Sequence, residues 1–473
     1  TPPPVVPAPM ASNDRLSEPL LRPAGTPRKA PTLQPLLVIA CLNTSAHIVA
    51  QTPAFCLRFQ ELALGIGMDM AGIAAAVGGL TALRSLVELA ATPVLARWSD
   101  RVGRRRVLRL CCAAYCVEFA LLATARSVVG LSVAHVVGGV LASHSAIEGS
   151  CITDAIPKGP ARFEAFGNLF MALGLAFVAA PALGGELTAQ HWEAPFVVAG
   201  AMTACSLMCA VFWMPEYLPE SRRRREPGMQ FWTTLKSFGR LVMNDRRLPW
   251  YVCASALCSL GISAFLSVRT IWVHELFGWD ARVIGRVVAT YGLTLVAAQF
   301  ILLPILLVAM NGREELLALL CLLVHTARFT AYGLAPSGDR IYLTLILSSA
   351  GSCSVPVLQA LCSRCVSEDE QMLLSGGAST VNTAMQVIGS LIGSQVFAAS
   401  LRGSTYMACN HLLVCAACCG LAAACLIPVM YAQSCAKRRS SPTSWVTRAE
   451  GMHGMDASLP SPTARGSMLL RRP

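Results

Sequence analysis

Ionisable and strongly polar side chains inside long apolar runs are the residues of this sequence that could do chemistry. At the centre of a membrane helix such a group costs about 2.5–3.5 kcal/mol, so it is kept where it pairs, lines a wet path or binds a solute. Arg84 and Glu88 are four residues apart. This spacing puts them on one helical face, where they can neutralise each other.

Two polar stripes recur at helical spacing. Asn43, His47 and Gln51 follow one another every four residues, and Asn382 and Gln386 have the same spacing. Amphiphilic residues on one face of an otherwise apolar helix indicate a water-filled cavity. The residues that we assign to a substrate or proton pathway are Asn43, His47, Gln51, Arg84, Glu88, Glu118, His135, Arg269, Asn382 and Gln386.

His135 is a candidate proton carrier, because a histidine with its usual pKa of about 6.5 changes charge near neutral pH. Glu88 is the other candidate. Three alternatives stay open: His135 as a neutral hydrogen-bond donor between helices, Arg84 with Glu88 as a structural ion pair, and Glu118 as a helix-packing group.

Signatures of enzymes and metal sites are missing from the sequence. It contains no H-E-x-x-H, G-x-S-x-G or G-x-x-x-x-G-K-[ST] pattern, and most of its 20 cysteines fall inside apolar runs. Only Cys362 and Cys365 have C-x-x-C spacing, and no second Cys or His pair follows at ligand distance. We therefore predict no enzymatic activity, no cofactor and no metal.

The composition indicates a membrane protein. Of 473 residues, 54% are apolar and 14% are charged, and mean hydropathy is +0.55. Soluble domains carry about 25% charged residues, so the surplus apolar surface here needs lipid as its solvent.

Runs of about 20 apolar residues, enough to cross about 30 Å of hydrocarbon, must be helices in lipid. The fold class is therefore all-α, a polytopic membrane protein with twelve transmembrane helices. The predicted spans are 34–57, 68–96, 106–126, 128–152, 164–187, 194–214, 249–273, 282–309, 315–334, 341–361, 374–400 and 407–432.

The basic residues are distributed unequally between the two sides of these spans. With both ends on one side, that side holds 29 Lys and Arg and the other side five. Lys and Arg accumulate in cytoplasmic loops, so both termini are expected in the cytosol. The net charge of +12 then anchors topology, and no element that reads a nucleic acid is present. The sequence leaves the identity of the membrane open, and we expect a monomer.

The spans divide into two sets of six, an arrangement typical of transporters. The predicted parts are a disordered cytoplasmic tail (1–33), an N-terminal six-helix bundle (34–214), a basic cytoplasmic linker (215–248), a C-terminal six-helix bundle (249–432) and a second disordered tail (433–473).

One loop carries a family resemblance. Residues 93–106, Pro-Val-Leu-Ala-Arg-Trp-Ser-Asp-Arg-Val-Gly-Arg-Arg-Arg, resemble the loop signature of the major facilitator superfamily. The segments 152–157 and 180–185 are similar to the tetracycline-efflux branch and to hippocampus-abundant-transcript-like proteins. The resemblance extends over about residues 34–432 and implies the two-bundle fold of that superfamily.

The resemblance also implies gating and packing roles. A tight turn needs Gly103, and Asp100 would meet the positive N-terminus of the eleventh helix across the bundle boundary. Arg104 and Arg105 can pair with Asp154 and hold the inner gate shut. The gating residues are Asp100, Arg101, Gly103, Arg104, Arg105 and Asp154, and the helix-packing residues are Pro181, Gly184 and Gly185.

The predicted function is secondary transport of a small organic solute across the bilayer by alternating access, with proton-coupled efflux as one form of it. Asn43 stands where tetracycline antiporters carry an acidic residue, so protons would need His135 or Glu88. Two alternatives stay open. One is a transporter-like receptor or trafficking partner without net flux, and the other is a proton-independent facilitator.

Overall fold

A computed structural model describes residues 32–142, 144–157, 159–223, 231–335, 337–367, 370–403 and 409–440, and these ranges contain helices and short connections without a strand. Eleven helices in these ranges are long and apolar enough to cross a membrane, and α14 with α15 makes a twelfth if the pair, bent by 48°, is one span. The all-α, twelve-helix prediction is confirmed. The predicted tails at 1–31 and 441–473 lie outside the described residues.

The first six spans are built from helices α1 to α8. Their bounds are α1 Gln34–Val49, η1 Ala50–Phe55, α2 Cys56–Gly65, α3 Met70–Val102, α4 Arg104–Thr124, α5 Val128–Gly138, η2 Gly139–Leu141, α6 His144–Ala155, α7 Pro160–Gln190, α8 Ala194–Met208 and η3 Cys209–Trp213.

The connecting segment and the last six spans follow. Their bounds are η4 Glu220–Arg222, α9 Phe231–Asn244, α10 Leu248–Phe277, α11 Ala281–Ala297, η5 Ala298–Leu302, α12 Leu303–Met310, α13 Glu314–Gly333, α14 Gly338–Leu347, η6 Ser349–Cys353, α15 Ser354–Ser363, α16 Gln371–Arg402, α17 Asn410–Ala424 and α18 Ile427–Ser440.

Two segments are more helical than predicted. The linker 215–248 contains α9, and α18 continues to Ser440 although the predicted tail starts at 433. Polar residues extend a helix beyond the apolar window because its backbone hydrogen bonds do not depend on lipid contact. Hydropathy alone therefore underestimates helix length.

The span formed by α1, η1 and α2 bends at its middle. Pro53 cannot donate a backbone hydrogen bond, and Thr52 before it leaves the helical region with φ −130° and ψ 115°. This bend lies in the wall of the cavity described below.

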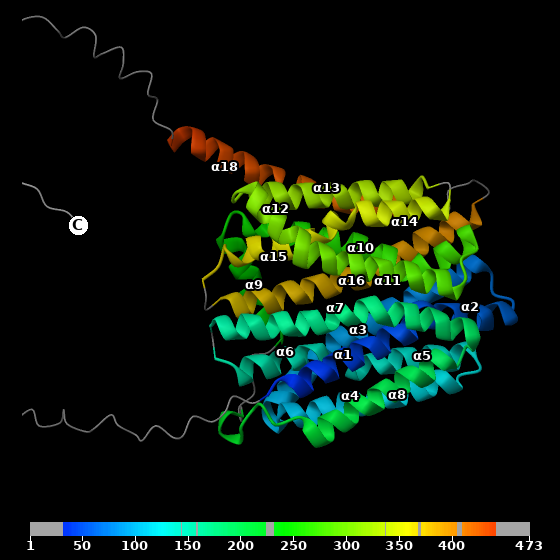
Figure 1. Cartoon of the computed structure of the whole chain (residues 1–473). Helices are drawn as coiled ribbons and strands as arrows, with labels where there is room; N and C mark the ends of the chain where they lie inside the picture. Colours follow the sequence, from blue (N-terminus) through cyan, green and yellow to red (C-terminus); the bar gives the residue numbers. More distant parts are fainter. Residues whose placement is uncertain are drawn as a thin grey trace, which may run out of the picture.

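The molecule has two ends, which we name from the connection between its halves. The linker end holds the segment that follows α8, and the Tyr217 hydroxyl donates a hydrogen bond there to the Thr32 carbonyl just before α1. The opposite end holds the α2–α3 connection. In Figure 1 the linker end, with α9 and α18, lies to the left, and α2 lies to the right.

The apolar core is continuous at the opposite end and divided at the linker end. One buried cluster joins both bundles, including Ile73 and Phe119 of the first and Trp272 and Phe397 of the second. Near the linker end, one cluster belongs to the first bundle alone and another to the second bundle with α9. The bundles therefore pack together at the opposite end and separate toward the linker end.

Candidate functional site

A cavity of about 520 Å³, the central cavity, lies between the two bundles. Its wall comes from α1, η1, α2, α3 and α5 of the first bundle and from α10, α15 and α16 of the second. Eight of the ten predicted pathway residues line it: His47, Gln51, Arg84, Glu88, His135, Arg269, Asn382 and Gln386.

The second-bundle wall carries a polar stripe that the sequence reasoning missed. Ser259, Ser263 and Ser267 of α10 recur every four residues, and Thr270 continues the stripe. The i, i+4 spacing was visible in the sequence. Serine is common at membrane helix contacts, so the spacing alone does not separate packing from a wet surface.

The central cavity continues toward the linker end. A second cavity of about 710 Å³ shares Asn382 and Gln386 with it and reaches Ser363 and Gln371, where α15 ends and α16 begins. Together the two cavities form one polar route from the middle of the protein to the linker end.

At the opposite end, polar contacts join the bundles. Glu186 of α7 forms ion pairs with Arg282 at 2.8 Å and Arg286 at 3.4 Å, both on α11. The Gln60 amide donates to the Glu275 carboxylate at 2.8 Å. The sequence reasoning missed these residues because polar and charged side chains are common near helix ends.

Asn43 and Glu118 are not among the residues that line the central cavity, so their part in a pathway stays a prediction. Asn43 is 1% exposed, and its amide donates to the Cys112 sulfur of α4 at 3.5 Å. Each step of four residues turns a helix by about 40°. The stripe therefore drifts, and Gln51 faces the cavity while Asn43 faces α4.

The predicted ion pair between Arg84 and Glu88 is wrong. The Arg84 guanidinium binds the Glu118 carboxylate of α4, with Nη1–Oε1 at 2.5 Å and Nη2–Oε2 at 3.3 Å. It also donates to the His135 carbonyl at 2.6 Å. A planar guanidinium fits a carboxylate in two parallel hydrogen bonds, a geometry that an i, i+4 neighbour does not offer here.

Glycine makes room for this pair. A Cβ atom at Gly138 of α5 would overlap the Glu118 carboxyl group. Glu88 stays half-buried in the wall of the central cavity and forms no ion pair with a described residue.

The His135 ring contacts two neutral side chains, and no described residue gives it a carboxylate partner. Its ring stacks on Phe55 with centroids 4.1 Å apart, and its Nδ1 lies 3.3 Å from the Gln51 amide nitrogen. Because Glu118 is held by Arg84, it does not reach the His135 ring.

A histidine–carboxylate pair does occur in α6, where the sequence reasoning did not place one. His144 Nδ1 lies 3.0 Å from Glu148 Oε1, and both residues are buried. Their i, i+4 spacing was the available signal.

Arg104 is the centre of an ion-pair cluster at the linker end. It binds Asp154 at 2.8 Å, as predicted, and Asp100 at 2.6 Å. Gly103 between α3 and α4 has φ 111°, which a side chain would strain. All of these contacts lie within the first bundle, whereas Arg101 is exposed.

Two predicted contacts of this cluster differ in the structure. Arg105 does not pair with Asp154. Its guanidinium donates to the carbonyls of Ala210 and Val211 instead. Asp100 binds Arg104, and within the described residues no hydrogen bond joins it to the N-terminus of α16. The separation of the bundles at this end accounts for that difference.

Glu216 caps this cluster and was not singled out from the sequence. Its carboxylate accepts the backbone N–H groups of Arg104 at 2.9 Å and Arg105 at 3.3 Å. A carboxylate at a helix N-terminus satisfies free N–H groups and faces the positive end of the dipole.

The predicted packing residues of α7 lie at close helix contacts. A Cβ atom on Gly184 would lie 2.9 Å from the carbonyl oxygens of Val49 and Thr52, and one on Gly185 would lie 2.5 Å from that of Ala281. Pro181 is one turn away, next to Gly285 of α11. Gly184 thus lets α7 approach the bend of the first span, and Gly185 lets it approach the other bundle.

The described residues contain no group of three or more His, Cys, Asp or Glu side chains that could hold a metal ion. Cys362 and Cys365 are present as free thiols.

The profile of the Major Facilitator Superfamily matches residues 36–394. The chain belongs to the Major Facilitator Superfamily. The predicted resemblance is thereby confirmed, and with it the two-bundle fold of a secondary-transporter family.

Several characterised members of the superfamily are similar in sequence. The class C tetracycline resistance protein of Escherichia coli is 27% identical over 328 residues, which cover 69% of this chain and 81% of that protein. Major facilitator superfamily domain-containing protein 10 of Mus musculus is 22% identical over 348 residues, covering 70% and 75%.

Solved superfamily structures show the same fold. The human organic anion transporter MFSD10 (TETRAN) aligns with a TM-score of 0.63 at 19% identity, covering 83% of this chain and 98% of that one. The nucleoside transporter NupG aligns with a TM-score of 0.67 at 11% identity, covering 84% and 98%.

Proposed function

We propose that this chain moves a small organic solute across its membrane by alternating access, with the central cavity as the binding site. The observation that carries the proposal is the continuity of the central cavity with the linker end, combined with polar contacts between the bundles at the opposite end. Such a cavity is loaded or emptied from one side at a time.

The proposed cycle exchanges the contacts at the two ends. When the linker end closes, Glu186 releases Arg282 and Arg286. Asp100 then comes within reach of the N-terminus of α16, where the helix dipole favours an anion. Arg104 keeps its ion pair with Asp154 and holds the loop in shape throughout.

The linker end is proposed to face the cytosol, because the basic residues concentrate there. Similarity to tetracycline resistance proteins supports export as the direction. If protons drive transport, Glu88 is the proposed carrier, since it is the carboxylate in the wall of the central cavity without an ion-pair partner among the described residues. The bundle bounds 34–214 and 249–432 and a monomeric state belong to the same proposal.

The experiment is flux through liposomes that contain the full chain. Vesicles loaded with a mixture of organic solutes are compared with protein-free vesicles, with and without a pH gradient, and the lost or gained solutes are identified by mass spectrometry. Protein-dependent flux supports the proposal. Flux that does not change with the pH gradient contradicts proton coupling. If no solute shows protein-dependent flux, the receptor-like alternative is supported instead.

A further inference from the structure

We propose that the transported solute is an organic carboxylate whose acid group binds Arg269 at the rim of the central cavity. Arg269 and Arg328 line a smaller recess beside this cavity, and the acid group points from Arg269 toward Arg328. This inference rests on the proposed function and names the chemical class of its substrate. It starts from the charges of the second bundle, which are not balanced within the protein.

Arg269 of α10 and Arg328 of α13 lie inside membrane-crossing helices. Among the described residues neither makes an ion pair or a hydrogen bond, and the Nε–H of each is buried without an acceptor. Arg328 is 4% exposed. Arg269 is half-buried. A charge without a partner is costly inside a membrane protein, so a buried and a half-buried guanidinium in one recess indicate a partner that arrives with the solute.

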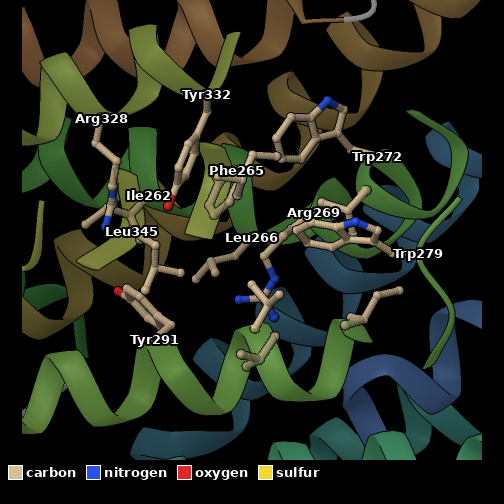
Figure 2. A pocket seen from close by; sticks show the side chains of 15 residues that line it. Ile262, Phe265, Leu266, Arg269, Trp272, Trp279, Tyr291, Arg328, Tyr332 and Leu345 are labelled. Carbon is tan, nitrogen blue, oxygen red and sulfur yellow. The ribbon is translucent and has the colours of Figure 1, made fainter. Parts of the chain in front are cut away.

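Both arginines line a narrow recess, the aromatic side pocket, with a volume of about 30 Å³. Figure 2 shows both guanidinium groups and the hydroxyls of Tyr291 and Tyr332 around the same space. No hydrogen bond joins either hydroxyl to a described residue. The pocket therefore offers donors, whereas acceptor oxygens are scarce, and an acidic group supplies them.

Aromatic rings explain how Arg328 persists without a carboxylate. Its guanidinium carbon lies 4.7 Å from the ring centroid of Phe329 and 5.9 Å from that of Tyr291. Ring faces attract a cation but accept no conventional hydrogen bond. They stabilise the charge and leave the N–H groups available.

Arg269 connects this recess with the transport route. Arg269, Ile262 and Leu266 line both the side pocket and the central cavity. The side pocket admits a group of a few atoms, whereas the central cavity of about 520 Å³ is in the usual range for a drug-sized body. The acid group thus enters at Arg269 toward Arg328, and the organic body stays between the bundles.

A carboxylate fits this donor set better than a cation or a neutral polar group. A guanidinium binds a carboxylate through two parallel N–H···O bonds, and the attraction between the two charges is stronger where water is excluded. A cationic solute would instead meet two uncompensated positive charges.

The test is equilibrium binding to the purified full chain. The probes are matched triads built on benzene, naphthalene and decyl bodies, each as the carboxylic acid, its primary amide and the corresponding amine. At least one acid is expected to bind tenfold or more tightly than its amide and amine. If no acid in any triad binds more tightly than its amide, the proposal is wrong. It is equally wrong if chloride or acetate competes as well as the best acid.

Variants locate the acid group. Arg269→Gln is expected to remove the preference for acid over amide, and Arg269→Lys to keep that preference with several-fold weaker binding. Arg340→Gln, at an exposed arginine of α14, is the control and should bind as the parent does. If Arg269→Gln does not fold, unchanged acid binding by Arg269→Lys and by Arg328→Lys overturns the assignment.

Binding and flux separate this inference from the proposed function. Acid-selective binding without flux would support the anion site and contradict the proposed transport function. Flux that shows no preference for acids keeps transport and removes the anion site.

Discussion

The two bundles treat their buried charges differently. In the first bundle Arg84 is matched by Glu118, and His144 contacts Glu148. In the second bundle Arg269 and Arg328 have no carboxylate within the described part of the chain. Charges that pair with one another hold helices together, whereas unpaired charges are available to a solute. We therefore assign structural work to the first set and solute binding to the second.

The largest loss of stability should come from breaking the Arg84–Glu118 ion pair. Glu118→Gln leaves the Arg84 guanidinium buried without its carboxylate, and loss of one partner of a buried pair costs about 3–5 kcal/mol. The midpoint temperature of thermal unfolding of the purified protein should fall, and so should its abundance in the membrane. Glu88→Gln, which removes a carboxylate that Arg84 does not bind, should change either quantity little.

A double change tests the pairing directly. Arg84→Met combined with Glu118→Gln removes the charge of both partners, and it should recover stability relative to Glu118→Gln alone. Equal stability of the single and double variants would show that the two residues do not act as a pair.

The unpaired charges should respond in the opposite sense. Arg269→Gln removes a guanidinium that no carboxylate of the described protein needs, so the unfolding midpoint should stay level or rise. Binding of the preferred organic acid should fall at least tenfold, which is about 1.4 kcal/mol. A loss of stability as large as that of Glu118→Gln would mean that Arg269 has a carboxylate partner in the protein. The second bundle would then pair its buried charges as the first bundle does.

Smaller effects are expected at the opposite end, where the bundles touch. Glu186→Gln removes two exposed ion pairs, each contributing about 0.2–1 kcal/mol. The population open at that end should rise by a few-fold, as measured by the distance between spin labels on α2 and α14. Glu193→Gln is the matched control, because Glu193 pairs with Arg126 inside one bundle at 3.2 Å. A shift of the same size in both variants would mean that the contact between bundles is not what holds that end.

The elements of the fold could be predicted because one physical quantity controls them. Apolar length sets the number of spans, and basic loops set the proposed orientation. The Arg104–Asp154 ion pair was also predictable, since the family resemblance brings two helix ends together. The i, i+4 rule gave the right spacing for Arg84 and Glu88 but the wrong partner.

Sequence reasoning could not supply the contacts between helices that no family motif marks. Glu118 contacts Arg84, 34 residues earlier in the sequence, and Glu186 contacts Arg282 across the boundary between the bundles. No local pattern encodes such pairs. Asn43 shows a subtler limit, because a stripe with a period of four drifts around a helix that repeats every 3.6 residues.

The smallest effect is expected at His135, and it tests whether His135 or Glu88 carries the proton in the first bundle. The sequence makes His135 a candidate proton carrier, but its ring contacts Phe55 and Gln51 and has no carboxylate partner among the described residues. A glutamine there keeps a hydrogen bond to Gln51 and cannot titrate. His135→Gln should therefore preserve gradient-driven flux and its pH profile, with stability reduced by about 0.5–1.5 kcal/mol through loss of the stacked ring. Glu88→Gln should abolish the response to the gradient while solute exchange continues, because a carboxylate in the cavity wall can gain and lose a proton as the cavity changes sides. If His135→Gln alone uncouples transport, His135 and not Glu88 is the proton carrier of the first bundle.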